Sequence, residues 1–275
     1  MSTRYSAFAA GVVRALVSLL GPRSRPATLA RTSVLLAPDI RVETPRGELV
    51  FHTPSRAALY WPRYAFEAEP ETLAWIDGFE AGEMFWDIGA GVGTYAMYAA
   101  LGSGIRVLAF EPNPFTHACL VKNLALNRLA DKVDALPVAI SDDASIERFH
   151  MVNDEAGSVG NVLGDAGQVR FADLSGEVAA AALGISIDEL IAKFATPLPD
   201  HIKIDVDSIE DKIVQGGLRT LSSETVRSVL IELDDTTDQH RAQRDRVLAL
   251  MAETGLRPIA RHDLADGTHN QLFER

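Results

Sequence analysis

The sequence predicts a doubly wound α/β protein, in which helices cover both sides of a mostly parallel β-sheet, preceded by a small N-terminal cap. Two observations lead to this fold class. Short apolar runs that suit strands buried on both faces alternate with helical patterns from residue 84 onward. A glycine-rich turn connects the first of these runs to the first helix of the alternation.

Composition and charge narrow the class of protein. With 275 residues and 47% hydrophobic residues, the chain suits one large α/β unit with an N-terminal extension, or two domains, and is not disordered. A net charge of −12 repels phosphate backbones, so we expect no nucleic-acid partner. The single cysteine, Cys119, excludes an intramolecular disulfide and indicates a reducing, cytoplasmic compartment.

Residues 5–20 form an apolar stretch that is too short to span a bilayer, which needs about 20 apolar residues. Arg14 in its middle, and the lack of a small-residue cleavage site, argue against a signal peptide. Five apolar residues share one helical face, namely Phe8, Val12, Leu16, Leu19 and Leu20. The pattern predicts a helix packed on the rest of the chain or on a partner, with weak contact to a membrane surface as the alternative.

Prolines and glycines interrupt residues 24–62, and two β-like runs lie between them at 41–44 and 48–52. This pattern predicts a small cap that carries a β-hairpin. We expect two domains, with residues 1–68 forming the N-terminal helix and cap and residues 69–275 forming the main domain.

The main domain has a regular order of elements. We expect a helix at 71–79, strands at 84–88, 106–110, 133–140, 202–206 and 226–233, and helices at 94–101, 114–127, 210–221 and 238–253. Asn113 and Pro114 suit the N-cap and the first position of the helix that ends at Asn127.

Residues 141–196 interrupt this order with several glycines and two short strand candidates, 146–152 and 169–172. We interpret the segment as an inserted hairpin and loop lying over the sheet. Loops at the carboxyl ends of strands recognise ligands in such folds, so the insertion is the leading candidate for substrate selection.

The strongest chemical signal is the strand-to-helix turn from Asp87 to Thr94, which has the form D-x-G-x-G-x-G. Gly89, Gly91 and Gly93 allow positive φ and close approach of a ligand to the backbone. A dinucleotide fingerprint needs glycine at position 94, where Thr94 stands, so the pattern argues against a nicotinamide cofactor. It matches instead the first motif of methyltransferases that use S-adenosylmethionine.

Glu111 ends the second strand, 24 positions after Asp87. A carboxylate at that place can accept hydrogen bonds from both ribose hydroxyls of an adenosine. This second signal strengthens the prediction of an S-adenosylmethionine site.

Residues 69–273 resemble the FkbM-like methyltransferases, which mostly methylate hydroxyl groups of sugars, glycolipids and polyketide-type natural products. The matching pieces are Phe85-Trp86-Asp87-Ile88-Gly89-Ala90 with Gly93 and Tyr95, Ala109-Phe110-Glu111-Pro112-Asn113-Pro114, Asn123 with Asn127, Ile202 to Asp207 with Glu210 and Gly216, and Asn270-Gln271-Leu272-Phe273.

The resemblance implies a class I, Rossmann-like methyltransferase fold with seven strands in the order 3-2-1-4-5-7-6, the last strand antiparallel. It also implies S-adenosyl-L-methionine as cofactor and O-methylation of a carbohydrate-containing or natural-product acceptor, with amide or amine nitrogen as another possible acceptor. The cofactor-binding residues that we expect are Asp87, Gly89, Ala90, Gly91, Gly93, Thr94, Glu111, Pro112, Asn113, Ser141 and Asp142.

Two positions depart from the family pattern. The family usually has asparagine where Gly91 stands, and this change leaves the loop suited to the cofactor. It usually has glycine where Ser208 stands, next to the transferred methyl group, so substrate choice or turnover can differ.

Asp205 and Lys203 are the catalytic candidates. They lie two residues apart and therefore on one face of the strand, together with His201. Asp205 suits a base that takes the proton of an alcohol acceptor, and Lys203 suits a group that orients it. The alternative is an ion pair that only orders the strand end.

Further carboxylates follow the next strand, Glu232, Asp234 and Asp235, and with Asp205 and Asp207 they could ligate a hard cation. We predict no metal, since acidic strand ends are common in a chain of this charge. Two other functions stay open: an NAD(P)-dependent oxidoreductase, and a non-catalytic cofactor-binding protein of the same fold. The sequence leaves open the acceptor's identity and the oligomeric state.

Overall fold

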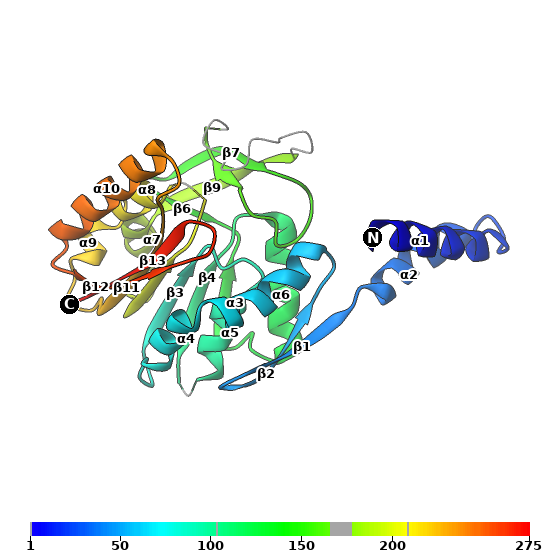
Figure 1. Ribbon diagram of the computed structural model, residues 1–275, viewed down its shortest axis with the longest axis horizontal. Coiled ribbons are helices and arrows are strands. Elements are labelled where there is room, and N and C mark those ends of the chain that lie inside the picture. Colours follow the sequence, from blue (N-terminus) through cyan, green and yellow to red (C-terminus); the bar gives the residue numbers. More distant parts are fainter. Residues whose placement is uncertain (1, 103, 166–177, 208) are drawn as a thin grey trace. The chain divides into compact units, whose positions relative to one another are not determined.

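The computed structural model describes residues 2–102, 104–165, 178–207 and 209–275 (Figure 1). Contacts divide the chain into two compact units, residues 1–39 and 40–275. Residues 40–68 thus belong to the larger unit by their contacts, while the expected domain boundary at residue 68 stays a prediction.

The smaller unit is a pair of helices, α1 (Ser2–Ser18) and α2 (Arg25–Leu36). Its one buried apolar side chain among the described residues is Val17, and the Arg25 guanidinium donates hydrogen bonds to the carbonyl oxygens of Ser18 (2.6 Å) and Leu20 (2.9 Å). Helix α1 confirms the predicted helix in residues 5–20, while what this helix contacts stays a prediction. Helix α2 was not predicted. Among the described residues, no helix has both the length and the apolar character needed to cross a membrane.

The larger unit contains a seven-stranded sheet in the order β12-β13-β11-β10-β3-β4-β5. Its strands are β3 (Met84–Ile88), β4 (Arg106–Phe110), β5 (Val133–Leu136), β10 (His201–Ile204), β11 (Ser228–Asp234), β12 (Arg257–Asp263) and β13 (Thr268–Glu274). The strands β5, β4, β3, β10 and β11 pair in parallel, and β13 is antiparallel to β11. The predicted fold class, strand order and antiparallel strand are confirmed.

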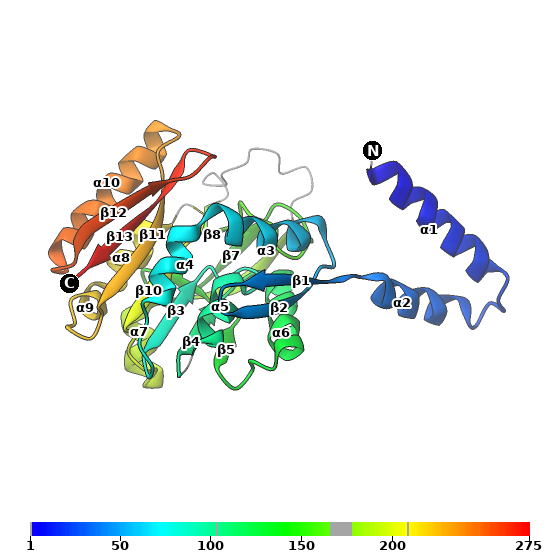
Figure 2. The same cartoon turned by 60° about the horizontal axis from the view of Figure 1, so that its bottom comes forward.

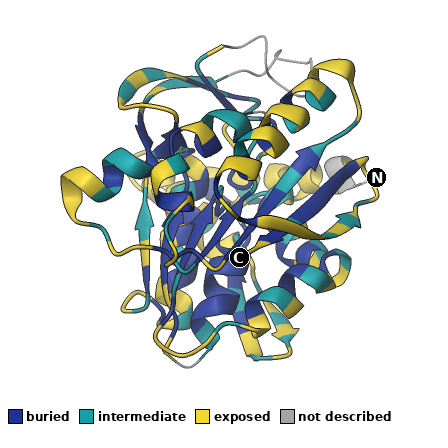
Figure 3. Ribbon diagram, turned by 90° about the vertical axis from the view of Figure 1, so that its left-hand side faces the viewer, coloured by how far each residue is buried: buried dark blue, intermediate teal, exposed yellow. Residues whose placement is uncertain are grey.

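Alternation of side chains along the strands gives the sheet two apolar faces, so that Phe85 contributes to one core cluster and Trp86 to the other. The first face packs against α3 (Arg56–Ala68), α4 (Pro70–Asp77), α5 (Thr94–Leu101), α6 (Pro114–Asn127) and strand β2. The second packs against α7 (Ile187–Phe194), α8 (Glu210–Gln215), α9 (Leu218–Leu221) and α10 (Asp238–Glu253). Figures 2 and 3 show these layers around the buried central strands.

The predicted hairpin forms from β1 (Asp39–Thr44) and β2 (Gly47–His52). Two asparagines of α6 hold its second strand. Asn127 exchanges two hydrogen bonds with the backbone of Val50 (2.8 and 2.7 Å), and Asn123 accepts one from the His52 N–H (2.7 Å). The two asparagines that carry part of the family resemblance therefore attach the hairpin to the main sheet's helical layer.

The insertion builds a second sheet in the order β6-β9-β7-β8, from β6 (Ala139–Ser141), β7 (Ser145–Met151), β8 (Val162–Leu163) and β9 (Val178–Ser186). The prediction of a strand at 146–152 is confirmed by β7, and the one at 169–172 lies outside the described residues. The expected strand at 133–140 is wrong as a single element: it splits into β5 and β6 at Pro137, which has no N–H to donate to a ladder.

Two helix predictions need correction. The expected helix at 210–221 is two short helices, α8 and α9, because Gly216 and Gly217 interrupt it and glycine is a poor helix former. Helix α3 was not predicted, since Pro62 within it reads as a breaker; the structure accommodates this proline inside the helix, buried.

Candidate active site

The glycine-rich turn lies where β3 and β4 end side by side. The N–H groups of Gly89 and Ala90 both donate to the Phe110 carbonyl oxygen at 3.0 Å, so the turn is fixed to the neighbouring strand. Gly89 has φ +84°, and a Cβ there would lie 1.8 Å from the Asp205 carbonyl oxygen. The close approach of β3 and β10 at this point therefore requires glycine.

Glu111 follows β4 and is 8% exposed. One carboxylate oxygen accepts from the Gly91 N–H (2.9 Å) and the other from the Asn113 N–H (2.8 Å). Burial raises the pKa of Glu111 to about 7, although these two hydrogen bonds by themselves lower it. Because each carboxylate oxygen can accept about two hydrogen bonds, each retains capacity for one further donor.

Asn113 is the N-cap of α6, as predicted, and its side-chain oxygen accepts from the N–H groups of Phe115 (2.9 Å) and Thr116 (3.3 Å). Its amide nitrogen donates to the Ser158 hydroxyl in the insertion at 3.3 Å. One side chain thus caps a helix and joins the insertion to it.

Lys203 and Asp205 form an ion pair at the end of β10. The Lys203 side chain is 1% exposed, while that of Asp205 is 32% exposed and faces a cavity. Burial alone lowers the pKa of Lys203, but the Asp205, Glu69 and Asp87 carboxylates outweigh burial and raise it above its usual value. The ammonium therefore stays charged beneath Asp205, and its nitrogen also lies 4.7 Å from the centre of the Tyr95 ring.

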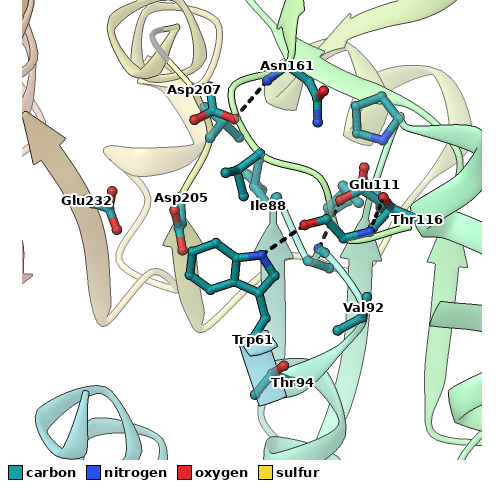
Figure 4. A pocket seen from close by; sticks show the side chains of 18 of the residues that line it. Trp61, Ile88, Val92, Thr94, Glu111, Thr116, Asn161, Asp205, Asp207 and Glu232 are labelled. Carbon is teal, nitrogen blue, oxygen red and sulfur yellow. Dashed lines mark hydrogen bonds between the residues drawn. The ribbon is translucent and has the colours of Figure 1, made fainter. Parts of the chain in front are cut away.

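The cavity has a volume of about 330 Å³ and lies over these strand ends (Figure 4). Seven of the expected site residues line it: Gly89, Ala90, Gly91, Thr94, Glu111, Pro112 and Asp205. In Figure 4, Glu111 lies on one side of the cavity and Asp205 and Glu232 lie on the other. The arrangement has room for an elongated ligand between the glycine turn and Asp205.

Besides Glu111 and Asp205, four carboxylates of the described chain line the cavity, and they are Glu69, Asp207, Glu232 and Asp266. Glu69 comes from the junction of α3 and α4, and its Oε2 accepts from the Asn270 amide (2.9 Å) and the Thr72 hydroxyl (3.2 Å). The negative potential of this lining favours a positively charged ligand group. Glu69 and Asp266 were not predicted, because nothing in their local sequence marks them.

Aromatic side chains of α3 form another wall. Tyr60 and Tyr64 stack with ring centres 5.1 Å apart, and Trp61 donates to the Gly157 carbonyl oxygen at 2.9 Å. This bond joins the cap to the insertion across the cavity. Phe66 packs against Phe51 and Tyr98 in the core and is not part of the lining.

The other expected site residues lie outside the lining, and they are Asp87, Gly93, Asn113, Ser141, Asp142 and Lys203. Asp87 lies in β3 opposite Lys203 of β10, and burial raises its pKa to about 6 although Lys203 opposes the shift. Ser141 donates to Asp142 at 3.0 Å, and the residues directly before them, Val138 to Ile140, contact the cavity instead. The expected contact of Ser141 and Asp142 with the cofactor stays a prediction.

Three of the carboxylates that the sequence suggests as metal ligands bond to backbone N–H groups or to basic side chains. Asp207 accepts from the N–H groups of Gly160 (2.7 Å) and Asn161 (3.1 Å), Asp234 pairs with His240, and Asp235 pairs with Arg244 and Arg261. Within the described ranges no group of three or more His, Cys, Asp or Glu residues is placed to hold a metal ion. Ser208, which departs from the family pattern, lies outside the described residues.

Comparison with known proteins identifies the family. The model of the methyltransferase FkbM domain matches residues 87–258. The chain is 24% identical over 241 residues to the 31-O-demethyl-FK506 methyltransferase FkbM of Streptomyces tacrolimicus, covering 80% of this chain and 89% of that protein. It is 26% identical over 163 residues to the hexuronic acid methyltransferase AglP of Haloferax volcanii, covering 59% of this chain and 61% of that protein.

Among solved structures, the methyltransferase FkbM of Methylobacillus flagellatus KT superposes with a TM-score of 0.50 at 16% identity. The match covers 78% of this chain and half of that one, and it supports the fold. The family match spans more than half of the sequence, including the glycine turn, Glu111 and the Lys203–Asp205 pair. The chain therefore belongs to the FkbM family of S-adenosylmethionine-dependent methyltransferases.

Proposed function

We propose that this methyltransferase transfers the methyl group of S-adenosylmethionine to a hydroxyl oxygen of a carbohydrate-containing or natural-product acceptor. The observation that carries the proposal is the pairing, in one cavity, of a buried Glu111 carboxylate near the glycine turn with the partly exposed Asp205 carboxylate opposite.

The residues near the glycine turn fit the cofactor. Glu111 has one hydrogen-bonding place left on each oxygen, which suits the two neighbouring hydroxyls of a ribose. Gly91 has no atom within 4 Å of a Cβ position, so a ligand can approach the backbone there. When bound, S-adenosylmethionine supplies an electrophilic methyl group on a positively charged sulfur.

Asp205 is the proposed base. It takes the proton of the acceptor hydroxyl while the oxygen forms its bond to the methyl carbon and the carbon–sulfur bond breaks. Lys203 does not take the proton, because its pKa is raised and the ammonium stays charged. It holds the Asp205 carboxylate toward the cavity instead, so that the acceptor oxygen is oriented for in-line attack.

The walls of the cavity favour a hydroxyl-rich acceptor. Tyr60, Trp61 and Tyr64 offer apolar ring faces that pack against the C–H face of a sugar or polyketide ring. Glu69 and Asp207 provide oxygens that accept from hydroxyl groups. The two relatives, named for 31-O-demethyl-FK506 and for hexuronic acid, support a natural-product or carbohydrate acceptor. The same acidic walls disfavour nucleic-acid phosphates.

The test is to incubate the protein with S-adenosylmethionine carrying a labelled methyl group and fractions of small molecules and glycans. Mass spectrometry should find the label on one class of hydroxylated compound, and fragmentation should place it on oxygen. Label on nitrogen, or cofactor binding without any transfer, would contradict the proposal.

Two variants control this experiment. Asp205→Asn removes the proposed base and should abolish transfer while the protein still binds S-adenosylhomocysteine. Asp134→Asn changes a carboxylate that is 60% exposed on β5, outside the cavity lining, and should leave transfer unchanged.

A further inference from the structure

The positive charge of the chain is concentrated in the N-terminal helices. Residues 1–38 contain five arginines, Arg4, Arg14, Arg23, Arg25 and Arg31, and no acidic residue or lysine. This segment therefore carries +5 in a chain of net charge −12, which leaves −17 on the remainder. All five arginines are exposed. A negatively charged surface would attract this segment and repel the rest of the chain.

The same helices expose apolar side chains. Tyr5, Phe8, Val12 and Leu16 follow one another at intervals of three and four along α1, so they share one face, and they are 72%, 73%, 43% and 62% exposed. Arg14 is two residues from both Val12 and Leu16 and points to the opposite side of the helix.

The apolar surface continues beyond α1. Leu19 after α1 is 82% exposed, and Val34, Leu35 and Leu36 at the end of α2 are 66%, 73% and 64% exposed. Exposed apolar groups of this number, next to arginines, mark a contact surface rather than an ordinary protein surface.

We propose that residues 2–36 bind an anionic lipid surface, with α1 lying in the plane of the headgroups. Helices that bind such interfaces combine an aromatic and aliphatic face with arginine or lysine on the polar face, which is the pattern of α1. An apolar protein groove would explain the exposed side chains but not the complete exclusion of acidic residues over 38 positions. The anionic leaflet explains both, because it takes up the apolar face and attracts each arginine.

The experiment is vesicle flotation of the full-length protein. Vesicles of phosphatidylcholine with phosphatidylglycerol should carry the protein to the top of the gradient, and vesicles of phosphatidylcholine alone should bind it much more weakly. Raising the salt from about 0.1 M to about 1 M should release most of the bound protein, because the Debye length falls from about 10 Å to about 3 Å.

Two double variants separate the apolar from the electrostatic contribution. Arg14→Gln with Arg23→Gln should lower partitioning to anionic vesicles about 25-fold, since each arginine contributes about fivefold. Phe8→Ser with Leu16→Ser should abolish flotation with either vesicle. The matched controls, Ile146→Ser on β7 and Arg257→Gln on β12, change exposed residues of the larger unit and should bind vesicles like the wild type.

Unchanged circular dichroism and affinity for S-adenosylhomocysteine would show that the variants fold. Failure of the wild type to float with anionic vesicles would refute the proposal, as would equal binding to neutral vesicles. If the wild type is a dimer by light scattering that does not float with anionic vesicles, and Phe8→Ser with Leu16→Ser makes it a monomer, the apolar face joins two copies and the proposal is wrong.

Discussion

Replacing Glu111 with alanine tests the cofactor site most directly. The structure gives each oxygen of this carboxylate one backbone donor and leaves a place for one ribose hydroxyl. Hydrogen bonds to a charged group contribute about 1.5–3 kcal/mol each, so losing one should weaken cofactor binding about 10- to 200-fold, and losing both about 100- to 10⁴-fold. Isothermal titration with S-adenosylhomocysteine measures the change.

The pKa of Glu111 adds a second readout. Because burial raises this pKa from 4.5 to about 7, the carboxyl group of the free protein is protonated below neutral pH, whereas ribose hydroxyls need the ionised form. Affinity should therefore fall about tenfold between pH 8 and pH 6, and Glu111→Gln should remove this dependence. For the free protein the sign is opposite: the group's contribution to stability is present below pH 4.5 and is lost as the pH rises through about 7.

A matched control is Glu83→Ala. Glu83 is buried to the same degree, 6% against 8% exposed, but it lies at the other end of the sheet, before β3, where it bonds to His201. Its replacement should lower the melting temperature without changing the dissociation constant. If Glu111→Ala binds S-adenosylhomocysteine as the wild type does, or if the wild-type affinity is flat from pH 6 to pH 8, the ribose assignment is refuted.

Other substitutions test the catalytic pair and the turn. Asp205→Asn should reduce kcat at least a hundredfold, since general-base catalysis contributes about 10²–10⁴-fold, and should leave the cofactor's dissociation constant within about threefold; a normal kcat would remove Asp205 from the reaction. Lys203→Met should lower kcat while leaving the dissociation constant of S-adenosylhomocysteine within about threefold, because the ion pair that holds the Asp205 carboxylate toward the cavity is lost. An unchanged kcat would leave Lys203 a purely structural role. Gly89→Ala should unfold the turn, because its Cβ would lie 1.8 Å from the Asp205 carbonyl oxygen. Gly91→Asn should fold and bind the cofactor, since φ +56° suits asparagine and no atom lies within 4 Å of its Cβ position. Thermal melts with and without S-adenosylhomocysteine compare the two variants, and an equal loss of melting temperature and ligand stabilisation in both would contradict this account.

The parts of the molecule that the sequence predicts well depend on neighbours in the chain. The turn from Asp87 to Thr94 is specified by glycines whose backbone geometry is local, and Asn113 caps the helix that begins at the next residue. Strand order followed from the resemblance, because several motifs in sequence order identify one topology.

The failures have two physical causes. Helix α3 contains Pro62, which local propensity counts as a breaker, but burial of its apolar face against the main sheet outweighs that cost. Strand β9 begins Val-Ala-Ala-Ala-Ala, a sequence of low β propensity, and forms because it pairs with β7 along its length. In both cases a tertiary partner decides what the local sequence leaves undecided.

The residues of the cavity also differ in whether their hydrogen-bond partners lie near or far in the sequence. Glu111 accepts a hydrogen bond from the N–H of Gly91, 20 positions away, but Glu69 accepts one from the amide of Asn270, 201 positions away. The insertion wall also depends on partners far apart in the sequence: Trp61 bonds to Gly157, 96 positions away, and Asp207 bonds to Gly160 and Asn161, 47 and 46 positions away. A chain can therefore change this wall without altering the cofactor turn. The acceptor that a member of this family selects should accordingly vary with residues 157–161 and α3, and a relative's acceptor is transferable only where these contacts are retained.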